Sequence, residues 1–293
     1  MTPSLPFPFG APVLGFWVDD LPPFLGPHWG PLGLRFYGLA YALGFVGAAW
    51  LLHRYARSGR SLLPSDKIAD FMVALVFGVL LGGRIGSYLL YDTWRTFPSD
   101  PFAIFRVWDG GMASHGGILG VIVALAWFAR SERIPFLHVG DLAASAGPVG
   151  LFLGRVANFI NGELWGKISF VPWAVIFPRS QPGAPTQLIA PRHPSQLYEA
   201  VLEGAVLFAL MQYRFWRTDV VRRHPGRLAG EFLLAYACVR AIGESFREPD
   251  ASLILGLSRG TFYSLFLGGF GLWLRLRTGS PLTPPSPEGS PRP

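Results

Sequence analysis

Seven apolar segments, each close to the length of a membrane-crossing helix, dominate this chain. A helix needs about 20 predominantly apolar residues to cross the hydrocarbon core of a bilayer. The segments are Leu32–Leu52, Ala69–Tyr91, Ala113–Ala129, Phe136–Arg155, Gln196–Tyr213, Leu228–Glu244 and Thr261–Leu276. Charged residues make up only 15% of the chain, whereas a soluble domain carries about 25%. The sequence therefore predicts an all-α polytopic integral membrane protein with about seven transmembrane helices.

The two ends of the chain differ from this apolar part. Residues 1–31 contain no Lys or Arg and are rich in Pro, Gly, Phe and Trp, so they lack the basic region of a secretory signal peptide. Aromatic rings favour the membrane–water interface, and we expect residues 1–31 to form an interfacial arm. Residues 32–277 are expected to form the seven-helix membrane domain, with an extracytoplasmic loop at about 156–195. The Pro/Ser-rich residues 278–293 are expected to be disordered.

The basic residues indicate an orientation, because cytoplasmic loops carry an excess of Lys and Arg. The loops after the first, third and fifth segments, together with the C-terminal tail, hold about twice as many Lys and Arg residues as the remaining loops. This pattern places the N-terminus outside and the C-terminus in the cytoplasm. The net charge is +7, but no basic stripe with interleaved aromatic residues occurs. An anionic membrane surface is therefore the expected partner, and nucleic acid is not.

Polar residues from six predicted helices converge at one level, the outer end of the bundle. They are Tyr37, Arg84, His115, Arg155, Asn158, Tyr198, Arg240, Glu244 and Arg247. Ionisable groups are costly in hydrocarbon and are candidates for function by default. Arg84 alone is explained as well by an anchor at the headgroups, or by an ion pair between helices, as by a functional role. His115 could likewise be a helix cap or a surface residue.

Spacing groups these residues on shared helix faces, because residues three or four apart are neighbours on a helix. Arg155 and Asn158 are related in this way, and Asn161 joins them if the helix continues. Arg240 and Glu244 are four apart, and Glu244 and Arg247 are three apart. One carboxylate between two guanidinium groups would leave one net positive charge for an anionic ligand. Arginines at this depth predict a site for the phosphate of a lipid headgroup.

The residues of this region also carry a family signature. The segment Arg155-x-x-Asn158-Phe-Ile-Asn161-Gly162-Glu163-Leu-Trp-Gly166 resembles the signature of bacterial phosphatidylglycerol–prolipoprotein diacylglyceryl transferases. Four further segments match that family in order, namely Phe36–Gly38, Asp109–Gly117, His193–Glu199 and Arg240–Asp250. The resemblance therefore extends from residue 36 to about residue 250.

The resemblance implies a reaction at the outer leaflet of the bacterial cytoplasmic (inner) membrane, in the first step of lipoprotein maturation. The diacylglyceryl group of phosphatidylglycerol is transferred to the lipobox cysteine thiol of a preprolipoprotein, a thioether forms and glycerol phosphate leaves. The partners are thus phosphatidylglycerol, the lipobox peptide and the bilayer, and no metal, nucleotide or other cofactor is needed. The nucleophile belongs to the substrate, so Cys238, expected to be buried within a helix, has no required role.

The resemblance also suggests a role for each site residue. His115 is the candidate general base for the thiol, acting directly, through Tyr37 or through water. Arg155 and Arg240 are expected to bind the phosphate, with Arg247 near the entrance. The remaining residues are expected to bind or orient the headgroup. Asn158 and Asn161 would donate hydrogen bonds to it, and Gly162 and Gly166 would allow the backbone to approach it closely. Glu163 and Glu244 would orient these groups or act as alternative bases, and Tyr198 and Arg84 would also contact the headgroup.

A transporter or flippase for an anionic lipid or a small anion is the alternative function. It would use the same arginines for binding without chemistry. Such a protein should carry polar residues through to the inner side or contain paired broken helices, and the sequence has neither feature clearly. A structural scaffold would not require the Arg/Asn/Glu set at all.

Overall fold

The computed structural model describes residues 10–13, 15–22, 25, 35–90, 102, 105, 111–249 and 251–277. Within them, every predicted apolar segment lies on a helix, so the helical character of the chain is confirmed. The helices are α1 (Phe36–Arg57), α2 (Ile68–Leu90), α3 (Ser114–Ser131), α4 (Phe136–Ile160), α5 (Ser195–Glu199), α6 (Leu207–Arg217), α7 (Val220–Arg223), α8 (Arg227–Phe246) and α9 (Arg259–Leu276). A π-helical segment, η7 (Ala200–Val206), joins α5 to α6 in one continuous rod.

Three of these helices are long and apolar enough to cross a membrane by length and composition. They span Phe36–Arg57, Ser65–Leu89 and Phe136–Ile160, and a shorter apolar helix covers His115–Ser131. The α5–α6 rod and α8 carry charged residues within their length, such as Glu203 and Arg240, which lowers their mean hydropathy. Their polar positions are where the candidate site lies.

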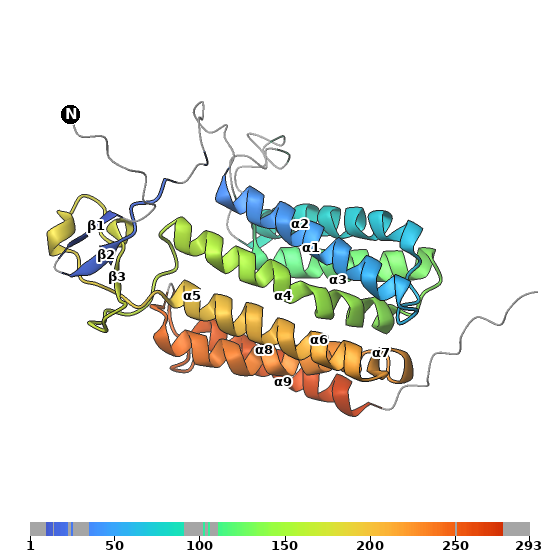
Figure 1. Ribbon diagram of the computed structural model, residues 1–293. Helices are drawn as coiled ribbons and strands as arrows, with labels where there is room; N and C mark the ends of the chain where they lie inside the picture. The colour runs from blue at the N-terminus through green and yellow to red at the C-terminus, as the bar shows by residue number, and fades with distance from the viewer. Residues whose placement is uncertain are drawn as a thin grey trace, which may run out of the picture.

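The long helices lie side by side, and α4 runs through the middle of the bundle (Figure 1). We call one end of the bundle the sheet end, because the only sheet in the described part of the chain lies there. The starts of α1, α5 and α9 and the ends of α4 and α8 lie at the sheet end (Figure 1). The largest buried apolar cluster lies toward the opposite end, where Tyr55 stacks on Phe215 with ring centroids 3.7 Å apart. Apolar packing therefore fixes one end of the helices, and the other end is available for polar groups.

The sheet is the feature that the sequence did not predict. Strand β1 (Gly10–Val13) pairs antiparallel with β2 (Phe16–Val18), and β2 pairs parallel with β3 (Val175–Ile176) from the long loop after α4. Strands of two to four residues are too short to show an alternating pattern. Part of the expected interfacial arm is thus attached to the long loop.

Several expectations fall on other parts of the chain. Residues 1–9, 14, 23–24 and 26–31 of the arm, together with Asp109, Gly110, Asp250 and the tail 278–293, lie outside the described residues. Cys238 lies in α8 as expected, but its side chain is exposed, so the prediction that it is buried was wrong. An exposed position in a membrane helix needs only an apolar side chain, which cysteine provides.

Candidate active site

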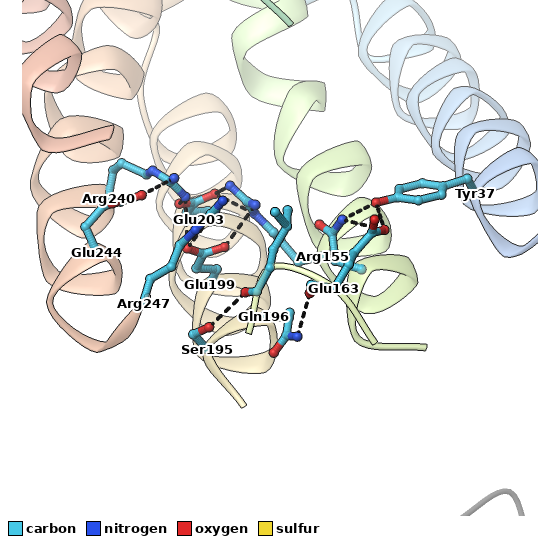
Figure 2. Close-up of polar contacts among 12 residues, drawn as sticks. Tyr37, Arg155, Glu163, Ser195, Gln196, Glu199, Glu203, Arg240, Glu244 and Arg247 are labelled. Carbon is cyan, nitrogen blue, oxygen red and sulfur yellow. Dashed lines mark hydrogen bonds and ion pairs between the residues drawn. The ribbon is translucent and has the colours of Figure 1, made fainter. Parts of the chain in front are cut away.

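Arg155, near the end of α4, binds two glutamates of the neighbouring rod. Its Nη2 and Nε donate to Oε2 of Glu203 over 2.8 and 3.1 Å, and its Nη1 lies 2.9 Å from Oε2 of Glu199. Glu199 and Glu203 are completely buried. Arg155 is thereby held in one orientation, because three of its nitrogens contact fixed carboxylates (Figure 2).

Arg240, on α8, binds the same two glutamates from the other side. Its Nη1 donates to Oε1 of Glu199 at 3.0 Å and to Oε1 of Glu203 at 2.9 Å, and its Nη2 donates to Glu244 one turn along α8. Arg247 approaches Oε1 of Glu199 to 3.5 Å. The arginines of α4 and α8 are therefore joined through shared carboxylates, as Figure 2 shows.

The local geometry of η7 brings the two glutamates to this position. Glycine at position 204 allows close approach of η7 to α4, because a Cβ there would lie 2.5 Å from Cβ of Phe152. A π-helical turn is wider than an α-helical turn and often occurs at functional sites. The approach of the two backbones places Glu203 against Arg155, which lies three residues after Phe152 on α4.

The charge of this cluster differs from the expectation. Three arginines (Arg155, Arg240 and Arg247) face three glutamates (Glu199, Glu203 and Glu244), so these six described residues have no net formal charge when all are ionised. The prediction of one net positive charge was wrong because Glu199 and Glu203 were not counted. A buried charge is tolerated only when it is paired, which explains why the rod supplies carboxylates. An anionic ligand must therefore share or displace these carboxylate contacts.

A second polar cluster lies between α1 and the end of α4. The hydroxyl of Tyr37 donates to Glu163, and Nδ2 of Asn158 donates to the Tyr37 hydroxyl. Asn158 and Asn161 both lie 3.4 Å from Oε1 of Glu163. Although Asn158 lies three residues from Arg155, it belongs to this separate set of contacts. The sequence signature therefore forms two adjacent clusters, one centred on arginines and one on Glu163 (Figure 2).

The loop after α4 is fixed by side chains from the start of α5. Nε2 of Gln196 donates to the carbonyl oxygen of Glu163 at 2.7 Å, and the Ser195 hydroxyl donates to that of Leu164 at 3.1 Å. Leu164 itself has a φ of 56°, a left-handed conformation that is uncommon for leucine. Two side-chain hydrogen bonds to adjacent carbonyls hold the loop in this strained shape, and with it the position of Glu163.

Gly162 and Asp19 bring the small sheet against this loop. Gly162 has a φ of 58°, and a Cβ there would lie 3.0 Å from Oδ2 of Asp19. Burial raises the pKa of Asp19 to about 6, against the attraction of the nearby Arg179 guanidinium. Arg179 donates to the carbonyl oxygens of Asn161 and Leu21. The arm and the long loop thus both contact the signature segment, on the side away from the helices.

Gly166 is enclosed by backbone, and this enclosure leads to a test of stability. A Cβ at this position would lie 2.5 Å from the carbonyl oxygen of His193 and 2.7 Å from that of Phe246. We expect Gly166→Ala to destabilise the protein by about 1–3 kcal/mol, because backbone must move to admit the methyl group. The measurement is the thermal unfolding midpoint in detergent. Gly140→Ala is the control, since nothing lies within 4 Å of that position in α4, and an equal midpoint for both variants would contradict the expectation.

The remaining predicted residues lie around the two clusters. His115, in the first turn of α3, packs edge-on against Tyr263 of α9 with centroids 5.3 Å apart, and no hydrogen bond between described residues joins it to Tyr37. Arg84 donates to the carbonyl oxygen of Gly111 at 3.1 Å and lies over the Tyr88 ring. The Tyr198 hydroxyl accepts a hydrogen bond from Nε1 of Trp173 at 2.6 Å and lies 3.1 Å from Nδ1 of His193. Burial lowers the pKa of His193.

Sequence reasoning missed Glu199 and Glu203 as site residues, and it missed Arg179. Glu199 and Glu203 are four residues apart within an apolar stretch, which is the same signal that identified Arg240 and Glu244. That spacing could have revealed the pair. Arg179 lies in an irregular loop, where no periodicity indicates which way a side chain points.

Comparisons with known proteins show what the whole chain is similar to. A family model described as prolipoprotein diacylglyceryl transferase matches residues 26–277. The chain is 42% identical to a protein of Rhodospirillum rubrum over 96% of this chain and 98% of that protein. It is 46% identical to one of Pseudoalteromonas translucida, over 83% and 88% of the two chains, and 45% identical to one of Nitratidesulfovibrio vulgaris, over 85% and 91%. Each of these relatives is named phosphatidylglycerol–prolipoprotein diacylglyceryl transferase.

Proposed function

Because the chain belongs to the prolipoprotein diacylglyceryl transferase family, we propose that it transfers the diacylglyceryl group of phosphatidylglycerol to a cysteine thiol of a prolipoprotein. The observation that carries this proposal is the pair Arg155 and Arg240, held side by side on two buried glutamates. Fixed guanidinium groups of this kind recognise phosphate. The pair lies at one end of the helices, where a headgroup would reach it from the bilayer surface.

The reaction exchanges a carbon–oxygen bond for a carbon–sulfur bond. The thiol gives its proton to a base, and the resulting thiolate attacks the saturated carbon of the diacylglyceryl group that carries the phosphate ester. The C–S bond forms as the C–O bond breaks, and the electron pair of that bond leaves on glycerol phosphate. Negative charge accumulates on the phosphate in the transition state, so donors already oriented toward it lower the barrier.

The two clusters divide this work. Arg155 and Arg240 bind the phosphate, and Arg247 lies near the entrance of the site. Asn158, Asn161 and Tyr37, arranged around Glu163, orient the glycerol hydroxyls of the headgroup. The bound phosphodiester adds one negative charge to an arginine–glutamate cluster of formal charge zero, and the glutamates release guanidinium donors to it. Tyr198 and Arg84 border the site, and no metal is required for this chemistry.

The site faces the outer leaflet of the bacterial inner membrane in this proposal. All seven long helical rods cross the bilayer, with the N-terminus outside and the C-terminus in the cytoplasm, and the sheet end is extracytoplasmic. Basic residues support this arrangement, because Arg54, Arg57 and Arg130 lie in the last turns of α1 and α3, away from the sheet end. Residues 1–31 then form an arm at the outer surface, 32–277 the catalytic membrane domain and 278–293 a cytoplasmic tail.

A mass measurement tests the proposed function. Purified protein is incubated with phosphatidylglycerol and a peptide that contains the lipobox cysteine, and the molecular mass of the peptide is then measured. We expect a mass gain of one diacylglyceryl unit and release of glycerol phosphate. A peptide with serine in place of the cysteine should gain nothing. An unmodified cysteine peptide, with the lipid instead moved between leaflets of a vesicle, would overturn the proposal in favour of a transporter.

His115 is the proposed base, and its substitution gives a separate prediction. We expect His115→Gln to lower kcat by about 10²–10⁴-fold, because glutamine keeps hydrogen-bonding capacity but cannot accept the thiol proton. The measurement is kcat in the mass assay, with His53→Gln, at the end of α1 away from the site, as the control. If the His115→Gln enzyme kept most of its rate, His115 would not be the base. Glu163 or Glu244 would then be the candidate.

A further inference from the structure

A long apolar groove lies between α2 and α3, away from the arginine cluster. Its volume is about 930 Å³. Apolar side chains that line it, such as Phe77, Leu81, Leu119 and Val123, are more than half exposed. The groove therefore opens outward, to the medium that surrounds the helices, and no described residue fills it.

Glycines make the groove continuous along both helices. Gly78 and Gly82 of α2 pack on Gly116 and Gly120 of α3 so closely that a Cβ at Gly120 would lie 1.9 Å from the carbonyl oxygen of Gly78. Small residues allow such close contact between membrane helices. The lining residues extend from Asp70 to Leu89 on α2. At a rise of 1.5 Å per residue this is about 30 Å, the thickness of the hydrocarbon core.

The two ends of the groove differ in chemistry. Asp70 and Glu132 line the end away from the sheet, and His115 lines the sheet end. Asp70 is exposed and lies 3.8 Å from Lys67, while Glu132 lies 3.2 Å from the same lysine. Among the described residues that line the groove, this end carries two carboxylates and no basic side chain, so we call it the acidic end, although the flanking loops are basic.

The sheet end of the groove is connected to the arginine cluster by α9. His115 packs on Tyr263, which lies three residues from Gly260. A Cβ on Gly260 would lie 2.4 Å from Oε1 of Glu244 and 3.0 Å from Nε of Arg240. The first turn of α9 therefore contacts both His115 and the Arg240–Glu244 pair, so a chain that leaves the groove at His115 emerges beside the site.

We propose that this groove binds the apolar signal segment of the prolipoprotein, with the basic N-terminal part of that segment at Asp70 and Glu132. This inference rests on the proposed function and identifies where its protein substrate docks. A signal peptide has a positive n-region, then 7–15 apolar residues, then the processing site. As a helix those apolar residues are about 10–22 Å long, so they fit within the groove. The residues that flank them then extend toward the acidic end on one side and toward His115 on the other, with the lipobox cysteine near His115.

Charge complementarity favours this occupant over a phospholipid acyl chain. An acyl chain has no basic group to place at Asp70 and Glu132, and its headgroup phosphate would be repelled by them. A basic n-region placed there would gain from both carboxylates and would remain at the surface of the membrane.

Site-specific photo-crosslinking tests the location. A benzophenone amino acid is placed at Leu119 or Val123, which are 63% and 60% exposed, and at the control positions Val46 on α1 and Phe266 on α9, which are 67% and 65% exposed. With a purified precursor in phosphatidylglycerol vesicles, we expect adducts with the signal segment from the two groove positions and few from the controls. Adducts with lipid alone, or equal yields at all four positions, would overturn the proposal. Crosslinking measures binding and not product formation, so its outcome can be told apart from that of the mass assay.

Neutralising the acidic end tests the orientation. We expect the wild-type protein to show a KM roughly fivefold lower for a precursor with a basic n-region than for one with a neutral n-region. Asp70→Asn combined with Glu132→Gln should abolish that preference. Asp219→Asn is the matched control, because Asp219 is an exposed carboxylate beside α7, away from the groove, paired with Arg60 and Arg223, and it should keep the preference. A preference that survives in the double variant would overturn the docking orientation.

Discussion

Arg155→Ala and Arg240→Ala should each lower diacylglyceryl transfer by about 10³-fold or more. Removal of one donor to developing negative charge typically costs about 10²–10³ in kcat. Each arginine here offers several donors, and each also holds Glu199 and Glu203 in place for the other arginine. The measurement is kcat in the mass assay with purified protein, after equal membrane insertion has been verified.

Two further variants separate loss of the phosphate contact from loss of the fold. Arg155→Lys keeps the charge but cannot reproduce the contacts of Nε and Nη2 with Glu203, so we expect a smaller loss of activity with near-normal stability. Arg214→Ala removes a guanidinium that binds Glu231 over 2.7 and 2.8 Å at the opposite end of the bundle. It should retain transfer. Near-normal transfer by Arg155→Ala or Arg240→Ala would rule out the phosphate-binding role.

Glu203→Ala should destabilise the protein by about 3–5 kcal/mol and also reduce transfer. Glu203 is completely buried and accepts from both Arg155 and Arg240. Truncation removes one of the buried carboxylates that Arg155 and Arg240 share. An uncompensated buried charge lowers the free energy of unfolding by several kcal/mol. The measurement is unfolding in detergent, together with KM and kcat for phosphatidylglycerol.

The conservative variant shows whether Glu203 acts through its charge. Glu203→Gln keeps the volume and one acceptor oxygen but leaves the cluster with one excess positive charge. We expect tighter binding of the anionic lipid, seen as a lower KM, with a lower kcat because the arginines are no longer held in place. Glu231→Gln, which alters the Arg214 pair at the other end, is the control. A normal KM and kcat for Glu203→Gln would show that Glu203 does not position the arginines.

The sequence was most informative where a residue type is costly in its surroundings. Arg155, Arg240 and Glu244 were identified because charges within apolar helices require a reason, and helical spacing correctly paired Arg240 with Glu244. The same rule applied to Glu199 and Glu203, yet their role depended on the approach of η7 to α4 at Gly204. Spacing within one helix cannot reveal a contact between two helices.

Elsewhere the sequence lacked any periodic signal. Strands β1, β2 and β3 are two to four residues long, and β2 pairs with a segment more than 150 residues away in the chain. Arg179, which donates to the Asn161 carbonyl, lies in the same loop region. Local propensity is weak over such short segments, and tertiary pairing decides their conformation.

By itself the sequence determined the helical rods and the residues that gather at one end of them. Both the cost of placing a polar group in hydrocarbon and the 3.6-residue period of a helix can be recognised locally along the chain. Only the tertiary structure decided which of these residues contact one another. It separated Arg155 from Asn158 into two clusters, placed His115 against Tyr263 rather than Tyr37, and balanced three arginines with three glutamates. The reason is that pairing of buried charges depends on distances between helices, and packing of glycines such as Gly204 against α4 sets those distances.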